Sequence, residues 1–446
     1  MSEPELTSAK PTLWRWWICA LLLLATTLNY MDRVALNQTS VRIQTAFALT
    51  NQEYGRLEGG FSFAFAVGTL CTGFLVDRVG VRWVYPAVVA GWSLAGFLTG
   101  YAPTYLALLG CRVLLGLFEA GNWPCGIRTV RQIMPAKERS LGNALFQGGT
   151  ALGAAITPFI VFACIQWADP DETARLAHFA LGGGTAIAGT GPPPDAAWQA
   201  PFRVIGAVGV VWVVIWLVTV RQRTLRTVVE SGIPDTPVAP FSTIFYDRRF
   251  WILLLVIIGV NTTWHTFRVW LPKFLQTEHG YTEAEMTLVM TFYYITADIG
   301  SWTVGLSVLG LATLGMRVHT ARMITFVLCT LLAVTSVAVP FLDRGPLLTA
   351  ALLTIGFGGL GLFATYFALS QELSAKHQGK VTGTLGAVNA IYLGFVFPYQ
   401  GKLIDKYDTI KPVLAAASIP AVIAVIAVLF FWPKSTLPLT TPHSTR

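Results

Sequence analysis

Stretches of about 20 apolar residues recur along the whole chain, and they limit its possible folds more than any other feature. At 1.5 Å of rise per residue, a helix of about 20 residues crosses the ~30 Å hydrocarbon core of a bilayer. Hydrophobic residues make up 54% of the 446 residues and charged residues only 12%, which is too apolar for a water-soluble domain. The sequence therefore predicts an all-α polytopic membrane protein whose backbone polar groups are satisfied within helices.

The apolar stretches predict twelve transmembrane helices. Their expected ranges are 14–32, 54–76, 84–101, 105–127, 141–164, 202–220, 250–274, 286–309, 323–342, 346–369, 381–401 and 413–431. Lys10 and Arg15 precede the first stretch as in a secretory signal, but no small-residue cleavage site follows before Asp32 and Arg33. We therefore expect an uncleaved first span.

A basic stretch punctuated by prolines lies near the middle of the chain, after the sixth span. It predicts an N-terminal six-helix half at 1–220, a cytoplasmic linker at 221–249 and a C-terminal six-helix half at 250–446. The fifth and eleventh spans support a duplication, because Gly142 and Gly153 have the same separation as Gly383 and Gly394. The alternative is that glycine is simply common in membrane helices.

The net charge of +8 follows the membrane topology. If both termini are cytoplasmic, the larger share of the lysines and arginines falls on that side, as the positive-inside rule requires. No basic domain remains to bind nucleic acid. The six cysteines lie inside spans without metal-ligand spacing, so we expect neither a metal site nor a cofactor.

Ionisable side chains at membrane depth cost about 2.5 kcal/mol or more each, so they mark candidate functional sites. The first span ends with Asn29, Tyr30, Met31, Asp32 and Arg33, which places an acid and a cation side by side. Asn29 lies one helical turn before this pair.

Two further spans carry polar groups on one helical face. The fourth has Arg112 and Glu119 two turns apart, and the seventh has Asn261, His265 and Arg268 at spacings of four and three. Glu58 and Asp298 are weaker candidates, because Glu58 lies close to a span end and Asp298 can pair locally.

Three arginines and one histidine against two carboxylates favour an anionic cargo. A guanidinium group offers a bidentate fork to a carboxylate and keeps its charge when it is desolvated. Asp32 and Glu119 are suited to carry protons, because a buried carboxyl beside an arginine changes protonation readily when water or cargo arrives. The structural alternative is that these groups only pair with one another to hold helices together.

The loop after the second span resembles the signature of the major facilitator superfamily. The matching residues are Gly73, Asp77, Arg78, Gly80 and Arg82 in the run GFLVDRVGVR. In that family this loop is cytoplasmic and locks the two halves in one orientation, so the resemblance implies twelve helices in two halves with a gate here.

Further runs resemble the anion:cation symporter branch of that family, which includes bacterial sugar-acid symporters and animal organic-anion carriers. They are NYMDR at 29–33, RVLLGLFEAGNWP at 112–124, ERSLGN at 138–143, WLP at 270–272 and GTLGAVN at 383–389. The likeness covers nearly the whole chain.

The resemblance implies roles for individual residues. In such carriers the acid of the first helix and the glutamate of the fourth carry protons, which would be Asp32 and Glu119, and the neighbouring arginine, here Arg33, holds the substrate carboxylate. Polar residues of helices five and eleven, here Gln147 and Asn389, would contact sugar hydroxyls. Tyr30 and Arg112 would line the site.

The chain departs from that pattern in two places. The second half has Gly305-Leu-Ser-Val-Leu-Gly310 where its loop signature would carry an acid, so its gate is expected to be lopsided. His265 and Arg268 add positive charge on the seventh helix beyond what the resemblance to bacterial sugar-acid carriers implies, which leaves open a more acidic or a different cargo.

The leading hypothesis is a proton-coupled symporter of a small organic anion such as a hexuronate or aldonate. We expect a monomer in the cell inner membrane that works by alternating access, with helices one, four, seven and ten lining its cavity. The alternatives are a proton-independent facilitator or exchanger of small carboxylates and a transport-like sensor. An intramembrane enzyme is disfavoured, because the spans carry no metal-pair or nucleophile motif.

Overall fold

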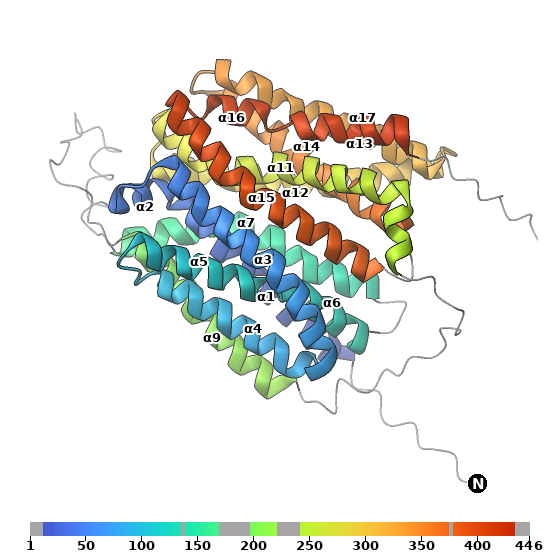
Figure 1. The fold of residues 1–446 in the computed structure, drawn as a ribbon, viewed down its shortest axis with the longest axis horizontal. Coiled ribbons are helices and arrows are strands. Elements are labelled where there is room, and N and C mark those ends of the chain that lie inside the picture. Colours follow the sequence, from blue (N-terminus) through green and yellow to red (C-terminus); the bar gives the residue numbers. More distant parts are fainter. Residues whose placement is uncertain (1–11, 135–138, 169–196, 221–240, 374–377, 433–446) are drawn as a thin grey trace, which may run out of the picture.

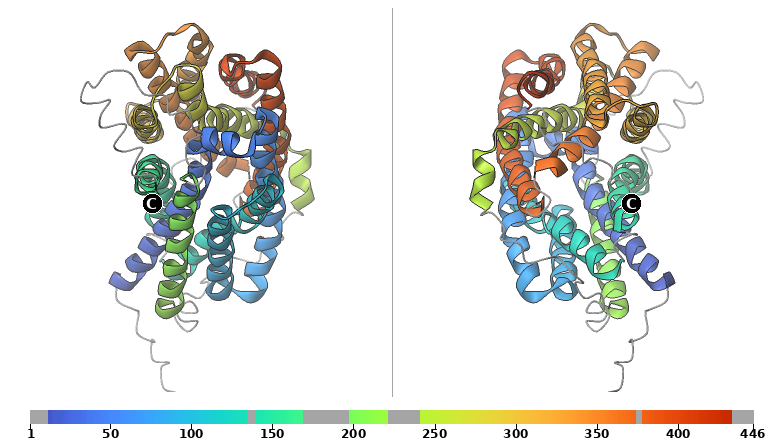
Figure 2. Two further views of the ribbon diagram at one scale, coloured as in Figure 1. Left: turned by 90° about the vertical axis from the view of Figure 1, so that its left-hand side faces the viewer. Right: turned by 90° about the vertical axis from the view of Figure 1, so that its right-hand side faces the viewer.

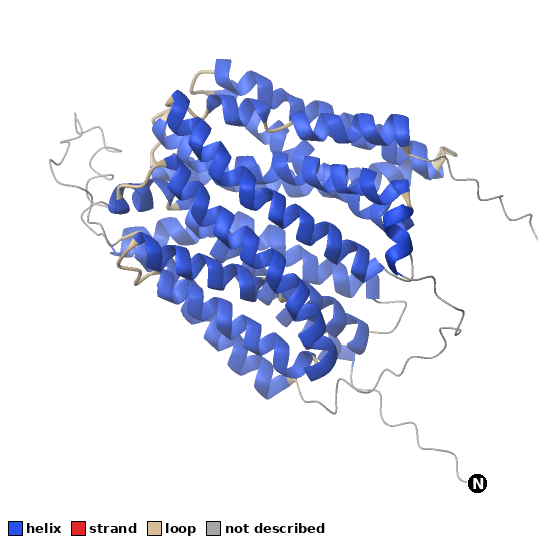
Figure 3. Cartoon of the chain, viewed as in Figure 1, coloured by secondary structure: helices blue, strands red, loops and turns tan. Residues whose placement is uncertain are grey.

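The structure, a computed structural model, describes residues 12–134, 139–168, 197–220, 241–373 and 378–432. These residues form helices and connecting loops, with no strand among them (Figure 3). Twelve helical segments are long and apolar enough to cross a membrane. The predicted all-α polytopic architecture is confirmed.

The first six spans are formed by seven helices, with one short helix between the first two spans. The spans are α1 (Thr12–Gln38), α3 (Asn51–Val79), α4 (Val81–Thr99), α5 (Tyr105–Glu119) with α6 (Asn122–Ile133), α7 (Arg139–Ala168) and α9 (Gln199–Thr219), and the short helix is α2 (Ser40–Phe47).

The last six spans follow the short 3-10 helix η1 (Phe241–Tyr246). They are α11 (Arg248–Thr277), α12 (Glu283–Thr313), α13 (Val318–Val334) with the 3-10 helix η2 (Thr335–Phe341), α14 (Pro346–Leu373), α15 (Gln378–Tyr407), and α16 (Lys411–Ala416) with α17 (Ile419–Phe431). Within the predicted linker 221–249, residues 221–240 lie outside the described residues, whereas η1 and the start of α11 are helical.

The second span of each six begins in the same way. Thr50 accepts a hydrogen bond from the backbone N–H of Glu53, and the Glu53 carboxylate accepts one from the Thr50 N–H. Thr282 and Glu285 repeat this capping box at the start of α12. Such reciprocal caps satisfy two orphan donors of the first turn and fix where the helix starts. The repeated device agrees with two halves of common design.

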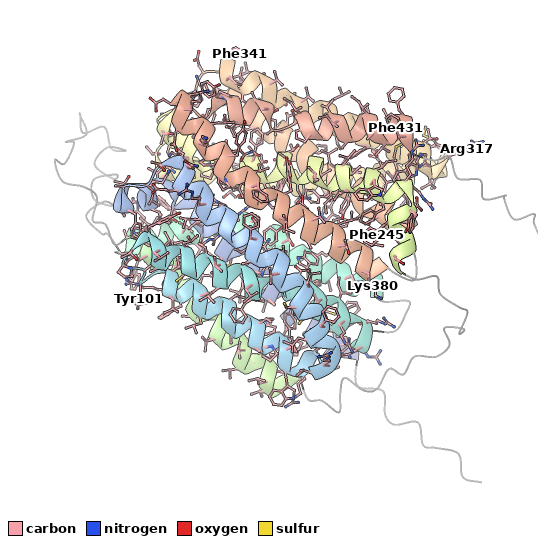
Figure 4. All side chains as sticks on the ribbon, in the orientation of Figure 1. Tyr101, Phe245, Arg317, Phe341, Lys380 and Phe431 are labelled. Atoms are coloured by element: carbon pink, nitrogen blue, oxygen red, sulfur yellow. The ribbon has the colours of Figure 1, made fainter. Side chains whose placement is uncertain are left out.

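Successive spans run in opposite directions, so the segments that connect them gather at two ends of the molecule. The α2 end holds α2 and the start of α3, whereas the linker end holds the turn between α3 and α4 and both flanks of residues 221–240 (Figure 1). Figure 4 shows Tyr101 and Phe341 at the α2 end and Phe245, Arg317 and Phe431 at the linker end. Seen from these two ends, the first and the last six spans occupy opposite sides of the molecule (Figure 2).

The two groups of spans meet mainly where α3 packs against α15 and α7 packs against α12. Glycines make the first contact close. A Cβ added to Gly55 would lie 2.4 Å from the carbonyl oxygen of Phe397, and one added to Gly401 would lie 2.1 Å from that of Asn51. Small residues of this kind let membrane helices approach to backbone contact.

The α3–α15 contact does not extend along the whole pair. Gly73 lies 18 residues after Gly55, and Gly383 lies 18 residues before Gly401, so each pair shares one helical face at 3.6 residues per turn. A Cβ at Gly73 or Gly383 would meet no described heavy atom within 4 Å. The two helices therefore touch at the α2 end and separate toward the linker end.

Polar contacts also join the two groups at the α2 end. Arg42 of α2 makes a bidentate pair with Glu283, at 2.5 and 2.9 Å. The Asp405 carboxylate at the end of α15 accepts hydrogen bonds from the backbone N–H groups of Asn51 and Gln52, at 2.9 and 2.8 Å. A carboxylate from one half thus caps a helix N-terminus of the other, which the helix dipole favours.

Matched glycine substitutions on α15 test this geometry. Gly401→Ala should destabilise the protein by about 1–3 kcal/mol, because the new methyl group overlaps the α3 backbone. Gly383→Ala places the same methyl group on the same face in open space, so it should be neutral or slightly stabilising. Melting temperatures of the purified variants measure the difference. Equal effects of the two substitutions would contradict the close contact at the α2 end.

Candidate functional site

The fourth span is broken directly after Glu119, and this break positions the glutamate. Helix α5 ends at Glu119 and α6 begins at Asn122. Where the hydrogen-bond ladder is interrupted, the backbone carbonyl of Glu119 accepts a hydrogen bond from the Asn29 side chain at 3.4 Å. The Asn122 side chain donates to Thr26 at 3.1 Å. Two side-chain bonds thus fasten the break to α1, since a membrane helix must satisfy freed backbone groups inside the protein.

Arg33 and Glu119 form an ion pair at the centre of the first group of helices. The Arg33 Nε lies 2.5 Å from the Glu119 Oε2, and the two residues are only 8% and 0% exposed. The Arg33 Nη2 and the Glu119 Oε1 have no hydrogen-bond partner among the described residues. Each member of the pair therefore retains capacity for a further polar partner.

Three aromatic rings surround the Arg33 guanidinium. Its central carbon lies 5.5 Å from the ring centroid of Tyr30, 5.0 Å from that of Phe61 and 4.7 Å from that of Phe65. Ring faces stabilise a cation without supplying a counter-charge, and they exclude the water that would screen it. The setting suits a guanidinium that exchanges one carboxylate partner for another.

Asp32 points to a different side of α1 from Arg33, because consecutive helical residues are about 100° apart. It is 2% exposed and faces α4, where a Cβ on Gly96 would lie 2.7 Å from its Oδ1. That Oδ1 has no hydrogen-bond partner among the described residues. The acid and the cation that are adjacent in sequence therefore occupy separate environments.

A second network lies closer to the α2 end and is centred on Glu58, which is 0% exposed. Its Oε1 accepts from Asn37 at 2.8 Å and lies 3.6 Å from Nη2 of Arg112. Its Oε2 accepts from Arg268 at 3.1 Å, and Arg268 also donates to Asn37 at 2.8 Å. This network joins α1, α3 and α5 of the first half to α11 of the second.

The network gives Arg112 a partner that the spacing along the fourth span did not indicate. Arg112 shares a helical face with Glu119, but its ion-pair partner in the structure is Glu58, while Glu119 pairs with Arg33. Glu58 was given little weight because it lies close to a span end. Asn37 was not singled out because the first span was ended at the charged pair, whereas α1 continues to Gln38. The sequence feature that could have indicated Asn37 is its position four residues after Arg33, which is one helical turn further along the same face.

The remaining candidate residues divide by their surroundings. His265 is half-buried and its Nδ1 accepts from Arg268 at 3.1 Å, while Asn261 donates to its own helix at Ile257. Asn389 is buried and its Oδ1 has no hydrogen-bond partner in the described part of the chain, and Gln147 is exposed on α7.

The predicted gating residues lie at the linker end. Arg82 donates to the backbone carbonyl of Val220 at 2.8 Å, and Arg78 is exposed. The Asp77 side chain lies outside the described residues. Gly80 separates α3 from α4 with a φ of 91°, a conformation that a residue with a Cβ rarely adopts.

The buried charges of the site are balanced. Three arginines (Arg33, Arg112 and Arg268) face three carboxylates (Asp32, Glu58 and Glu119) within the described residues. The sequence had suggested a surplus of positive charge, because Glu58 was set aside. A carboxylate that approaches Arg33 therefore competes with the Glu119 carboxylate, which is already paired with it.

Comparisons with known proteins agree with this architecture. The model of the Major Facilitator Superfamily matches residues 22–394. The chain is 24% identical to a galacturonate transporter of Dickeya chrysanthemi over 64% of this chain and 79% of that one. It is also 24% identical to a hexuronate transporter of Escherichia coli K12, over 64% of this chain but only 63% of that protein.

The fold is similar to that of a solved bacterial homologue of the human lysosomal transporter Spinster, in an inward-facing and unoccupied conformation. The TM-score is 0.77 at 18% identity, and the match covers 94% of this chain and 96% of that one. At this identity the likeness concerns the fold alone.

The Arg33–Glu119 pair gives an asymmetric prediction for stability. Glu119→Gln leaves Arg33 with a charge that it cannot lose, whereas after Arg33→Gln the Glu119 carboxyl can bind a proton and become neutral. Glu119→Gln should therefore destabilise by about 3–5 kcal/mol and Arg33→Gln by less. The double variant should lose less than the two singles together. Unfolding free energies measure this cycle, and additive losses would show that the pair is not coupled.

Proposed function

Because the chain belongs to the Major Facilitator Superfamily, we propose that it is a secondary active transporter that carries a small organic anion together with protons. It is a multi-pass membrane transporter and not an enzyme. The proposed cargo is a sugar acid such as a hexuronate or an aldonate. The similarity to the galacturonate and hexuronate transporters supports this class of cargo, and so do the buried arginines.

The observation that carries the proposal is the Arg33–Glu119 pair. An anion that binds Arg33 competes with Glu119 for the same guanidinium, since both are carboxylates. A displaced Glu119 would be an unpaired charge in an apolar interior, which costs several kcal/mol. Proton uptake by Glu119 removes that cost. Anion binding and protonation at this site therefore favour each other.

Asp32 is the proposed second proton site. Its Oδ1 has no described hydrogen-bond partner, and its environment differs from that of Arg33. A carboxyl group in such a position is stable when neutral and costly when charged, unless a cation or water approaches it. A change in water access to Asp32 when the two halves move would link the proton on Asp32 to the conformation of the carrier.

Other polar residues near the pair are assigned to cargo recognition. Tyr30 and His265 are half-buried, and the amide oxygen of Asn389 has no hydrogen-bond partner among the described residues. These groups are therefore suited to hydrogen bonds with sugar hydroxyls. Gln147 is the proposed counterpart of Asn389 on α7. Asn29, Arg112 and Arg268 hold the surrounding helices and charges in place.

Alternating access would move the halves 1–220 and 250–446 against each other, with 221–249 as the linker. The α3–α15 contact at the α2 end and its separation toward the linker end support a state that is open at the linker end. Positive residues at that end, among them Arg78, Arg82 and Arg128, support a cytoplasmic position for it by the positive-inside rule. We therefore assign an inward-open state in the cell inner membrane, with both termini cytoplasmic.

The loop between α3 and α4 is the proposed gate of the opposite, outward-open state. When the linker end closes, Asp77, Arg78 and Arg82 come within reach of the second half and can pair across the interface. Gly73 and Gly80 leave room for that approach, since neither carries a side chain. In the present state Arg82 instead holds the end of α9 through Val220.

Proton coupling also meets a thermodynamic need. An inside-negative potential opposes anion entry by about 2.3 kcal/mol per charge per 100 mV. One proton per monoanion cancels this term, and two protons make uptake electrogenic. Two proton-binding carboxyls, Asp32 and Glu119, allow either ratio.

Neutralising both Asp32 and Glu119 distinguishes proton-coupled symport from facilitation without protons. Vesicles containing the Asp32→Asn, Glu119→Gln double variant should lose galacturonate accumulation driven by a pH gradient, acidic outside, by at least tenfold. Asp298→Asn is the matched control, because Asp298 is a half-buried carboxyl of α12 outside the proposed site. That control should retain accumulation. If pH-driven uptake survives in the double variant, the carrier is a proton-independent facilitator or exchanger.

A further inference from the structure

We propose that Glu58 is an internal counter-carboxylate that limits the cargo to a single negative charge, and that it determines the selectivity for monoacids over diacids. This inference rests on the proposed transport of sugar acids and specifies which of them bind. It concerns a residue of α3 that contacts the arginines beyond Arg33, and it follows from how those arginines are occupied.

Glu58 uses both of its oxygens on fixed partners. Its Oε1 accepts a hydrogen bond from Asn37 and forms an ion pair with Arg112, and its Oε2 accepts a hydrogen bond from Arg268. Asn37 itself is held, since its amide nitrogen also lies 3.0 Å from the Tyr54 hydroxyl and its oxygen accepts from Arg268. Glu58 is thus held by side chains from α1, α5 and α11, and its carboxylate is not available for exchange with solvent.

Arg112 is the arginine that a second cargo carboxylate would reach. The guanidinium carbons of Arg33 and Arg112 lie 5.0 and 4.8 Å from the centroid of the same Phe61 ring. The two guanidinium groups are therefore at most about 10 Å apart, which is the sum of those distances. The terminal carboxyl carbons of a six-carbon diacid are ~6 Å apart when it is extended, given C–C bonds of about 1.5 Å. A diacid is therefore long enough for one carboxylate to contact Arg33 while the other contacts Arg112.

The charge of Glu58 opposes this second contact. Arg112 has Nε and Nη2 without hydrogen-bond partners among the described residues, so it has free donors for a carboxylate. Arg112, however, already pairs with Glu58 at 3.6 Å, a carboxylate that it shares with Arg268. A second cargo carboxylate beside Arg112 would face the Glu58 carboxylate in an apolar interior, where like charges repel strongly. A monoacid with a hydroxyl or aldehyde carbon at that end avoids this repulsion.

Removing the Glu58 charge should therefore change which acids bind. Glu58→Gln keeps the shape and an acceptor oxygen, but it removes the carboxylate that Arg112 and Arg268 share. The second carboxylate of a diacid supplies the missing charge. The specificity should move from monoacids toward diacids, which a role in helix packing alone would not produce.

The experiment compares two probes on the purified full-length chain by isothermal titration calorimetry. Galacturonate carries one carboxylate, and galactarate carries two on a six-carbon chain. Wild-type protein should bind galacturonate at least tenfold more tightly than galactarate. In Glu58→Gln the ratio of the two dissociation constants should shift toward galactarate by at least tenfold.

A charge-matched double variant provides the control. Glu58→Gln with Arg112→Gln again has equal numbers of buried arginines and carboxylates, and it lacks the proposed second anchor. The gain in galactarate affinity should disappear in it. A gain that persists in the double variant would overturn the assignment of Arg112.

The remaining outcomes separate this inference from the proposed function. If wild-type protein binds galacturonate and Glu58→Gln leaves the ratio unchanged, the inference is wrong and the proposed function stands. If wild-type protein binds galactarate as tightly as galacturonate, the inference is overturned without any variant, even where Glu58→Gln fails to fold. If wild-type protein binds neither probe, the proposed cargo class and the inference that rests on it both fail.

Discussion

The cost of a charge in an apolar interior is the constraint on which the rest of this structure depends. Three arginines are buried among the helices, and none can lose its charge. Each therefore needs a carboxylate nearby, and Arg33 has Glu119 while Arg112 and Arg268 share Glu58. With Asp32 included, the described residues bury as many carboxylates as arginines. In the proposed mechanism, an anion that binds Arg33 displaces Glu119, and a proton taken up by Glu119 removes the cost of its unpaired charge.

The packing of the helices brings these charged side chains together. The break after Glu119 is held to α1 through Asn29, so Glu119 is presented to Arg33. The close approach of α3 to α15 at Gly55 and Gly401 keeps the α2 end shut, and Arg268 reaches across the interface to Glu58. The same contacts would have to separate for the α2 end to open. The proposed cargo site and the contact between the two groups of helices therefore share Arg268 and Glu58.

Apolar stretches were sufficient to predict the architecture, and charges at membrane depth marked most of the charged residues that the structure buries. The twelve spans follow from hydropathy, because lipid permits few alternatives to a helix. Arg33, Glu119 and Arg268 stood out because charges are rare at membrane depth. The partnership of Glu58 with Arg112 and Arg268 could not be predicted in this way, since it depends on how α3, α5 and α11 are placed in space. Asn37 was missed because hydropathy marks where lipid ends, whereas α1 continues inside the protein.

Proton uptake on anion binding is the measurement that tests the central claim most directly. Galacturonate binding to the wild-type protein is titrated calorimetrically at one pH in two buffers with different heats of ionisation. If a cargo carboxylate displaces Glu119 from Arg33, the observed enthalpy will depend on the buffer, with a sign that reports protons taken up from it. Glu119→Gln should reduce that dependence. A binding enthalpy that is identical in the two buffers for wild-type protein would contradict the account.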